Sequence, residues 1–379
     1  MKKKNYSIRK LINDIHLWLG LGSGIILFLV CLSGTILAFE EEIKSFFSNE
    51  ISVESTSQKT TVASLTQTLQ ESNNGFVTGF TIPSDLHEPY VFSVKKDLKE
   101  RRGSQVLVNP YTSSIHKIEK TSADDFMLIV FRLHRWLLLD TNIGRPIVGI
   151  ATIIFLLLSI SGFVLWFPKK VKWKNIKQGF KIKTNANWKR INHDLHNTLG
   201  FYACIFLVIM CITGLCWSFE GYKKGLGNLI GAEIFNRSAP TFEVGTPLEE
   251  EIVSIDEAIS IANEALNYNG KLTVSFPNEN SNYYVFRKTN DANWSPITTD
   301  NLYMDASGKI LAVEWFQEKP LNVQFASLIK PLHTGEIFGT FSKIIYFITC
   351  LIATSLPITG TLIWWNKLKK KRKKALSVN

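Results

Sequence analysis

Long runs of apolar residues divide the chain into alternating hydrophobic and polar segments. The four runs cover residues 17–39, 147–167, 199–219 and 344–365, and none contains Lys, Arg, Asp or Glu. Each has about 20 residues, enough to cross a hydrocarbon layer of ~30 Å at ~1.5 Å per helical residue. The pattern predicts four transmembrane helices and excludes a wholly soluble protein.

The polar segments between the spans show patterns of short helices and strands. In the later segment, Ser254 is the expected N-cap of a helix, followed by strand-like runs at 271–276 and 283–288. A hairpin comes last, with strands at 301–305 and 310–314. The earlier segment repeats this order more faintly, with a helix near 62–71 and strands at 76–82, 90–95 and 105–109. Each segment is expected to fold as a small α+β module.

Charge indicates how the spans are oriented. The chain has 43 Lys and Arg against 32 Asp and Glu, a formal net charge of +11. Of the basic residues, 21 lie in three short segments, which are the N-terminus, the loop at 169–190 and the tail at 367–374. By the positive-inside rule, these segments and both termini are cytoplasmic, and the two polar modules lie outside. Because the basic runs flank every other span end, we attribute them to orientation and expect no nucleic-acid partner.

The two halves of the chain match each other, which indicates an internal duplication. At a shift of 180 residues, Asn13-Asp14-Ile15-His16 meets His193-Asp194-Leu195-His196, and Ser33-Gly34 meets Thr213-Gly214. At a shift of 198 to 199 residues, His134 meets His333 and Ser161-Gly162 meets Thr359-Gly360. The first span resembles a signal peptide, but it matches an internal span and no small-x-small site follows it. We therefore expect an uncleaved helix.

These observations define the expected organisation. The fold class is an α-helical membrane protein with four transmembrane helices in a duplicated arrangement and two small extracytoplasmic α+β domains. All five cysteines fall inside the spans, so no disulfide framework supports these domains. The expected segments are 1–39 (cytoplasmic N-terminus and first span), 40–125 (first external domain), 126–167 (interfacial helix and second span), 168–192 (basic cytoplasmic loop), 193–219 (third span), 220–330 (second external domain), 331–365 (fourth span) and 366–379 (basic cytoplasmic tail).

Histidine placement indicates the candidate chemistry. Of seven histidines, four form matched pairs. His16 and His196 lie at the cytoplasmic ends of spans one and three, and His134 and His333 lie just outside spans two and four. Imidazole is a common metal ligand, histidine is an axial ligand of haem iron, and facing helices can hold a cofactor in a bundle. We therefore expect two haems, one near each membrane face, with each iron ligated by one pair. The alternative is that these are merely polar residues at the interface.

Matched glycines accompany the histidines. Gly20 and Gly200 lie one helical turn from the inner histidines His16 and His196. Gly34 and Gly214 lie 18 residues from these histidines, about 27 Å along a helix. Gly162 and Gly360 lie near the inner ends of the other two spans. We expect each histidine pair to face Ser-Gly or Thr-Gly pairs, so that two helices hold a flat ligand and two accommodate it. Ordinary helix–helix contacts are the alternative. The six are Gly20, Gly200, Gly34, Gly214, Gly162 and Gly360.

Three further residues have open roles. His193 is a spare ligand, a contact of a haem propionate or only a polar residue. Arg132 and Arg135 lie on the apolar run 126–139 and contact either haem propionates or lipid headgroups.

His134 lies 12 residues before Pro146, so a straight helix would carry it clear of the bilayer. We therefore expect a break at 140–146 and an interfacial or re-entrant helix at 126–139.

These residues resemble the PepSY-associated transmembrane family, which includes inner-membrane ferric-siderophore reductases. The resemblance covers nearly the whole chain. It implies four spans, two external PepSY-type domains, haem b, reduction of iron–siderophore complexes, and ligand roles for the four paired histidines. The chain departs from the family at Leu17-Trp18 and at Asn197, where a basic residue is more usual. The motifs that carry the resemblance are Asp194-Leu195-His196 with Leu199-Gly200, Ser161-Gly162-Phe163-Val164-Leu165-Trp166, and Tyr303-Met304-Asp305-Ala306-Ser307-Gly308-Lys309-Ile310.

The expected function is electron transfer across a bacterial inner membrane. An electron enters at His16 and His196 and leaves at His134 and His333, where a ferric siderophore is reduced and releases its iron. The expected donor is a quinol or a cytoplasmic reductase, because no nucleotide-binding fold is evident. Apart from these, the expected partner is membrane lipid.

Two other functions fit parts of the pattern. One is a haem-free membrane scaffold that presents PepSY domains as peptidase-regulating or protein-binding modules. The other is a transporter, since duplicated spans are common among transporters. The spans contain no Asp, Glu, Lys or Arg to line a pathway, which argues against transport.

Overall fold

The computed structural model describes residues 7–48, 51, 53–54, 58–73, 75–100, 103–236, 238–244, 252–279 and 281–376, with side chains as far as residue 370. Parts of two predicted basic segments lie outside this description, namely Lys2, Lys3 and Lys4, and the side chains of Lys371, Arg372, Lys373 and Lys374. The chain forms two compact units. The helical unit comprises residues 1–44, 122–234 and 326–379, and the sheet unit comprises 45–121 and 235–325.

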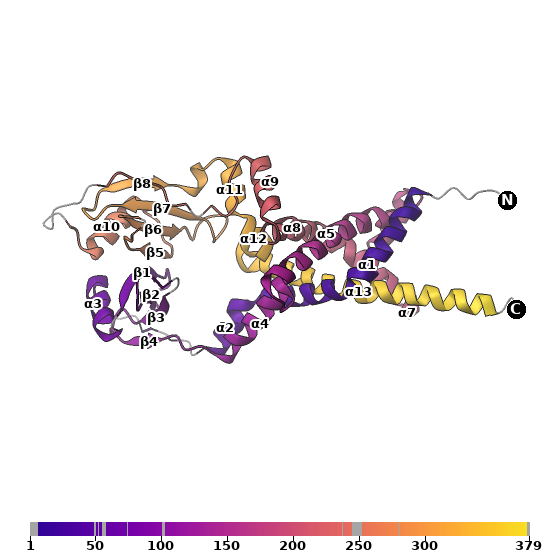
Figure 1. Ribbon diagram of the computed structural model, residues 1–379, viewed down its shortest axis with the longest axis horizontal. Helices are drawn as coiled ribbons and strands as arrows, with labels where there is room; N and C mark the ends of the chain where they lie inside the picture. Colours follow the sequence, from indigo (N-terminus) through magenta and orange to yellow (C-terminus); the bar gives the residue numbers. More distant parts are fainter. Residues whose placement is uncertain are drawn as a thin grey trace. The chain divides into compact units, whose positions relative to one another are not determined.

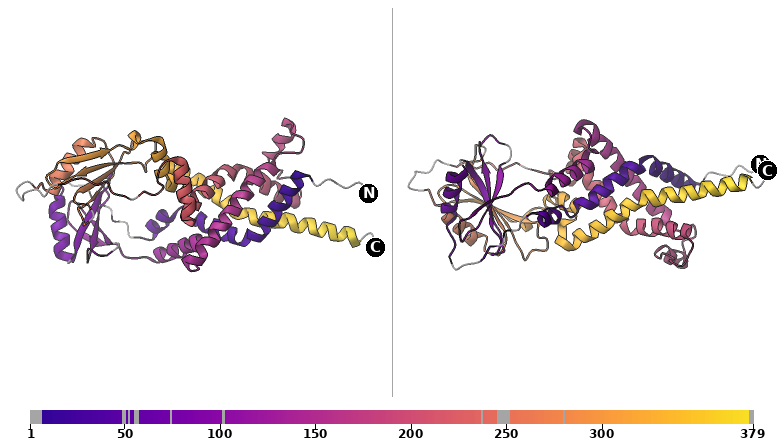
Figure 2. Two further views of the ribbon diagram at one scale, coloured as in Figure 1. Left: turned by 45° about the horizontal axis from the view of Figure 1, so that its top comes forward. Right: turned by 90° about the horizontal axis from the view of Figure 1, so that it is seen from below.

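Four long apolar segments build the helical unit (Figures 1 and 2). They are α1 (Ile8–Leu37), α5 (Thr141–Trp166), the segment Trp188–Ser218, and α13 (Gly339–Leu376). Each is long and apolar enough to cross a membrane, which confirms that prediction. The first and third segments each pack against α5 and α13. The start of α1 and the end of α13 lie at the same end of this unit (Figure 1).

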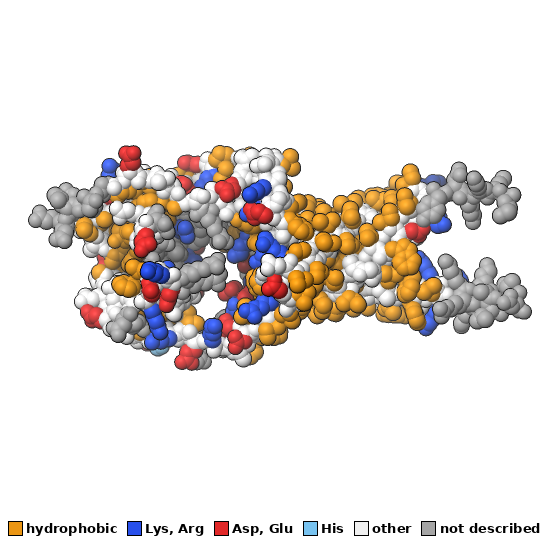
Figure 3. Space-filling model, in the orientation of Figure 1, with side chains coloured by type: hydrophobic (Ala, Val, Ile, Leu, Met, Phe, Trp, Pro, Cys, Tyr) orange, Lys and Arg blue, Asp and Glu red, His pale blue; other side chains and the backbone are white. Residues whose placement is uncertain are grey.

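The outer surface of these helices suits lipid. Ile25, Ile205 and Phe341 expose 80%, 62% and 71% of their area. Figure 3 shows hydrophobic side chains covering the flank of the helical unit. Apolar surface of this extent is unfavourable in water, and a helix satisfies its own backbone groups, so lipid tails can cover it. Between the second and third long segments, a Cβ on Gly149 would lie 2.5 Å from the ring of Phe219. This glycine therefore allows the two helices to approach closely.

The third segment contains a local irregularity. Helix α7 (Trp188–Asp194) leads into the π-helix η1 (Leu195–Leu199), which continues as α8 (Gly200–Ser218). Asn187 caps α7 by accepting the backbone N–H of Arg190. Single π-turns are rare and often occur at functional sites. This one contains His196.

Before the second span, the chain reverses direction. Helix α4 (Ser122–Trp136) ends at Leu137 and Leu138, whose φ angles of 54° and 60° lie in the left-handed region. Their backbone N–H groups bond back to the carbonyls of Leu133 and Arg132. Asp140 then caps α5. The expected break is real but lies at 137–140. The predicted extension of the break to Pro146 is wrong, because this proline lies inside α5.

Shorter helices flank the long segments. They are α2 (Glu40–Phe47), α6 (Trp173–Gly179), α9 (Glu220–Ile230), α11 (Leu321–Ser327), α12 (Ile329–Thr334), and the 3-10 turns η3 (Phe316–Glu318) and η4 (Glu336–Phe338).

The sheet unit is one antiparallel sheet of eight strands in the order β4-β3-β2-β1-β5-β6-β7-β8. The two segments predicted as separate α+β modules are joined in this sheet, because β1 pairs with β5 and places Phe80 opposite Val274. Helices α3 (Val62–Asn73) and α10 (Ile255–Ala265) supply buried residues to the core of the sheet. The strands are β1 (Phe76–Ile82), β2 (Tyr90–Lys95), β3 (Ser104–Val108), β4 (Ile115–Lys117), β5 (Leu272–Ser275), β6 (Tyr284–Thr289), β7 (Thr299–Met304) and β8 (Ile310–Glu314).

One core and one cap hold the two halves of this sheet together. Leu65, Phe92 and Phe286 are among its fully buried side chains, each worth about 1.5–3 kcal/mol of burial free energy. Asp256, in the first turn of α10, accepts the backbone N–H groups of Val62 and Ala63 at the start of α3. This carboxylate therefore satisfies two otherwise unpaired donors of the neighbouring helix.

Candidate functional site

The structure brings together His16 and His196, which are called the inner pair, as His134 and His333 are called the outer pair. His16 comes from α1 and His196 from the π-helix η1, and their ring centroids lie 6.3 Å apart with planes at 86°. Arg9 fixes the start of α1, because its Nη2 donates to the carbonyls of Leu165 and Phe167 at 2.8 and 2.7 Å. These carbonyls belong to the end of α5, where helical partners run out.

The outer histidines are paired in the same way. His134 comes from α4 and His333 from α12, with ring centroids 6.4 Å apart and planes at 55°. His134 reaches this position because the turn at 137–140 folds α4 back against α1 and α5. The matched pairs of the sequence are thus spatial pairs, one set near each end of the long helices.

Each histidine is anchored through Nδ1 to a hydroxyl on a facing helix. The Nδ1···Oγ distances are 2.8 Å for His16 to Ser161, 2.9 Å for His196 to Thr359, 3.3 Å for His134 to Ser33, and 3.1 Å for His333 to Thr213. At the outer pair, Nδ1 also lies 2.9 Å from the Val30 carbonyl and 3.0 Å from the Met210 carbonyl.

These anchors select the tautomer that can bind a metal. A carbonyl oxygen only accepts, so Nδ1 of both outer histidines carries the proton. At the inner pair, the hydroxyls of Ser161 and Thr359 lie within reach of backbone carbonyls, and when they donate to these carbonyls their oxygens accept from Nδ1–H. In a neutral ring Nε2 is then the free lone pair. Hydrogen bonds of this kind orient metal-ligating histidines generally.

Burial favours the neutral form at the outer pair, which lies outside the four long spans. It lowers the pKa of His134 and lowers that of His333 to about 4, where the charge of His134 adds to the effect. Both rings are therefore uncharged near pH 7, as ligation requires.

Four of the predicted glycines lie against the imidazole rings. A Cβ on Gly34, Gly162 or Gly360 would lie 3.1, 3.3 or 3.2 Å from Cε1 of His134, His16 or His196, and one on Gly214 would lie 2.9 Å from Cε1 of His333. The absence of a side chain thus lets each ring approach the opposite helix. Gly20 and Gly200 differ, since their nearest neighbours are Leu158 and Leu356 at 3.8 and 3.6 Å.

A cavity of about 640 Å³ surrounds the inner pair. Its volume falls within the range of roughly 300–1,000 Å³ that is typical of cofactor pockets. Besides the two histidines, it is lined by the four glycines of the inner end and by polar residues from the helix ends. The glycines are Gly20, Gly162, Gly200 and Gly360, and the polar residues include Arg9, Lys10, Asn13, His193 and Lys367.

The separation of the rings within each pair would let the two histidines hold one iron between them. With metal–nitrogen bonds of about 2.0–2.1 Å and a ring radius of about 1.1 Å, the centroids of two such rings lie about 6.3 Å apart. In the part of the chain that the structure describes, no group of three or more His, Cys, Asp or Glu is placed to hold a metal ion. A bound haem would need only two protein ligands per site, which each pair could supply.

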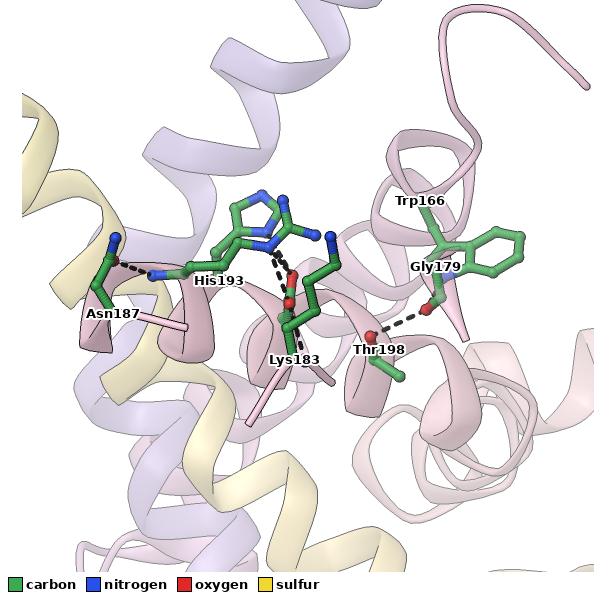
Figure 4. Close-up of polar contacts among 8 residues, drawn as sticks. Trp166, Gly179, Lys183, Asn187, His193 and Thr198 are labelled. Atoms are coloured by element: carbon green, nitrogen blue, oxygen red, sulfur yellow. Dashed lines mark hydrogen bonds and ion pairs between the residues drawn. The ribbon is translucent and has the colours of Figure 1, made fainter. Parts of the chain in front are cut away.

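The basic loop at 168–192 is bonded to the segment that carries His196 (Figure 4). Asp194, with 5% of its side chain exposed, accepts from Nε of Arg190 at 2.8 Å and from the backbone N–H of Lys183 at 3.3 Å. His193 Nδ1 lies 3.6 Å from the same carboxylate. Thr198 and the indole of Trp166 both donate to the Gly179 carbonyl. These bonds hold the segment next to His196, and they place His193 in the cavity wall beside an acid.

Trp217 and Arg145, which the sequence did not single out, lie at the outer pair beside the predicted Arg135. Trp217 packs against His333 with ring centroids 5.2 Å apart, and its carbonyl accepts from Nε of Arg145 at 2.6 Å. Arg135 is half-buried over the rings of Phe131 and Trp136, and its pKa is lowered by burial and by the charge of Arg145. Arg132 is exposed instead. Trp217 corresponds to Leu37 in the first half, so the repeat gave no signal for it.

Comparison with known proteins places the chain in a family. No curated protein matches it significantly. The family model described as the PepSY-associated TM region matches residues 14–367, nearly the whole chain, and this range contains all four paired histidines. The protein therefore belongs to the PepSY-associated transmembrane family.

Proposed function

We propose that this protein carries electrons across a bacterial inner membrane through two bound haem b groups and reduces ferric chelates, such as ferric siderophores, on the extracytoplasmic side. One observation carries the proposal. Two facing histidine pairs, each anchored through Nδ1, lie near opposite ends of four membrane-length helices. Duplication relates the two histidines within each pair, but it does not relate one pair to the other, so the same paired geometry occurs at two independent positions.

The residues of the chain have distinct roles in this proposal. His16 and His196 would hold the inner haem, and His134 and His333 the outer one. Bound haem supplies a one-electron Fe(III)/Fe(II) couple whose potential depends on hydrogen bonds and dielectric around it. The hydroxyls of Ser161, Thr359, Ser33 and Thr213 would keep each ring in its ligating tautomer and orientation.

The substrate reaction requires only an electron. One electron converts the Fe(III) of a chelate into Fe(II), which hard oxygen donors hold less tightly, so the iron is released. A quinol would supply two electrons and release two protons, enough for two ferric ions. A cytoplasmic reductase is the other donor class. The basic segments support a topology with both termini cytoplasmic, and the matched halves support an origin by duplication.

A haem-free scaffold is the second candidate. The observation that favours it is the sheet unit, which accounts for much of the chain and joins strands from both halves in one sheet. Such a surface could bind another protein without any redox step. In this case the histidine pairs would only stabilise helix contacts.

Electron transfer is tested in proteoliposomes with an electron donor inside and a ferric chelate with a Fe(II) indicator outside. We expect Fe(II) to appear outside with the wild type and to fall to background with His333→Ala. His116→Ala is the control, because this exposed histidine lies in β4 of the sheet unit. A reduction rate unaffected by His333→Ala would contradict the proposal.

A further inference from the structure

Two arginines lie beside the outer histidine pair. Arg135 directly follows His134 on α4, with its guanidinium 5.5 Å from the ring centroids of Phe131 and Trp136. Arg145 lies near the start of α5 and is bound through Nε to the carbonyl of Trp217, whose indole contacts His333. Arg135 is therefore adjacent in the sequence to His134, and Arg145 is linked to His333 through Trp217.

Neither guanidinium has an acidic partner among the residues that the structure describes. Ion pairs within 4.0 Å involve other cations of the helical unit. Arg190 pairs with Asp194, Lys343 with Glu42, and Lys44 with Glu40. Lys343 is the position that matches Arg145 in the second half. Glu220 is paired with Lys223 at 2.9 Å, and the pKa of its carboxyl group is lowered by this lysine and also by the charge of Arg145.

Two half-buried cations of like charge without a counterion are unfavourable on their own. Their mutual repulsion and lost hydration are offset when an anion binds between or against them. The planar guanidinium fork matches a carboxylate, with two parallel N–H···O bonds, better than a lysine does. Since Arg145 uses Nε for the Trp217 carbonyl, its terminal nitrogens remain for a ligand.

We propose that Arg135 and Arg145 form a carboxylate-binding site at the outer histidine pair. Two sources could supply the carboxylate, a propionate of the outer haem or a carboxylate of the ferric chelate, and both rest on the proposed function. Arg132 is excluded from the site, because it is exposed on the same helix. It offers a matched control variant.

The test compares Arg135→Gln, Arg145→Gln, Arg135→Lys and Arg145→Lys with Arg132→Gln in purified full-length protein. If a propionate is bound, both Gln variants shift the midpoint potential of the outer haem or weaken its retention, and the KM values for all chelates change alike. If the chelate is bound, the KM for ferric citrate rises about tenfold or more, the loss expected for a charge-assisted bond. The KM for a ferric hydroxamate without carboxylates then stays unchanged. The Lys variants should recover part of either effect.

The proposal is overturned if both Gln variants match Arg132→Gln in outer-haem potential, haem retention and ferric citrate KM. Calorimetry of citrate binding distinguishes a failure of the carboxylate site from a failure of the electron-transfer function, because citrate binding can be measured without haem. Protein that carries no haem but binds citrate through Arg135 and Arg145 would refute the electron-transfer function and retain the site. Protein that has neither property would refute both.

Discussion

His333 and Thr213 are joined across two helices by a hydrogen bond in which Nδ1 lies 3.1 Å from Oγ1. The hydroxyl of Thr213 is itself directed to the carbonyl of Ile209 at 2.7 Å, so its oxygen can only accept from the ring. The bond therefore fixes both the orientation and the tautomer of His333. A hydroxyl contact to Nδ1 recurs at the other three paired histidines, and metal-ligating histidines are generally oriented by hydrogen bonds of this kind.

Removing this hydroxyl should weaken the outer haem. For Thr213→Val we expect a loss of about 10- to 100-fold in haem affinity at one of two sites, the usual effect of losing such an orienting bond. Thr213→Ser should restore most of it. Haem titration followed by the b-type absorbance measures the effect. Thr349→Val is the control, since among the described residues this buried threonine bonds only to the carbonyl of Ile345 in its own helix. Equal affinity in both Val variants would count against the anchoring role.

Adding a methyl group at Gly214 should displace the His333 ring. A Cβ there would lie 2.9 Å from Cε1, too close for the ring to keep its position. Overpacking of this kind costs about 1–3 kcal/mol, so Gly214→Ala should weaken outer haem binding by about tenfold or more. In Gly22→Ala, the added atom meets nothing within 4 Å, so haem content should be unchanged. Full haem occupancy in Gly214→Ala would show that the ring is not confined as described.

Truncating Asp194 should loosen the basic loop at 168–192. This buried carboxylate is bound by Arg190 and by the backbone of Lys183, so Asp194→Ala leaves Lys183 N–H without its partner at a cost of about 1–3 kcal/mol. Asp194→Asn keeps one acceptor and should have a smaller effect. Limited trypsin digestion at Lys183 and Lys189 in detergent gives the measurement, with cleavage of Asp194→Ala faster by about tenfold. Cleavage at the wild-type rate would contradict this.

The two helices of the sheet unit should be coupled through Asp256. In Asp256→Ala the first-turn N–H groups of α3 lose their acceptors, which costs about 1 kcal/mol as for a lost N-cap. Hydrogen exchange at Val62 and Ala63 in the full-length protein should accelerate about fivefold. Glu264→Ala, at an exposed position on the same helix, should leave exchange in α3 unchanged. Identical exchange in the two variants would remove Asp256 as the link.

Local patterns in the sequence predicted most elements of the fold. Residues 76–82 and 90–95 form β1 and β2 with the predicted bounds, and Ser254 caps α10, because these signals depend on neighbouring residues alone. The pairing of β1 with β5 was not predictable, since nothing in either strand shows which partner its free edge takes. Strand β4 has only three residues, too few for a visible alternation.

The candidate site was predictable where the two halves match. Alignment of the halves brought out the four histidines and the Ser-Gly and Thr-Gly pairs that face them. It gave no signal for Trp217 or Arg145, because the other half has Leu37 and Lys343 at these positions. The role of the hydroxyls as Nδ1 partners also needed the structure, since it depends on distances between helices that are far apart in the chain.

The central claim is that each histidine pair ligates one haem, and the reduced-minus-oxidised spectrum of purified protein tests it most directly. For wild-type protein made with ample haem, we predict a b-type spectrum and two haems per chain. In His196→Ala and in His333→Ala, about half of the signal should remain, and the double variant should have none. A wild-type protein without a b-type signal, or single variants that keep both haems, would contradict the account.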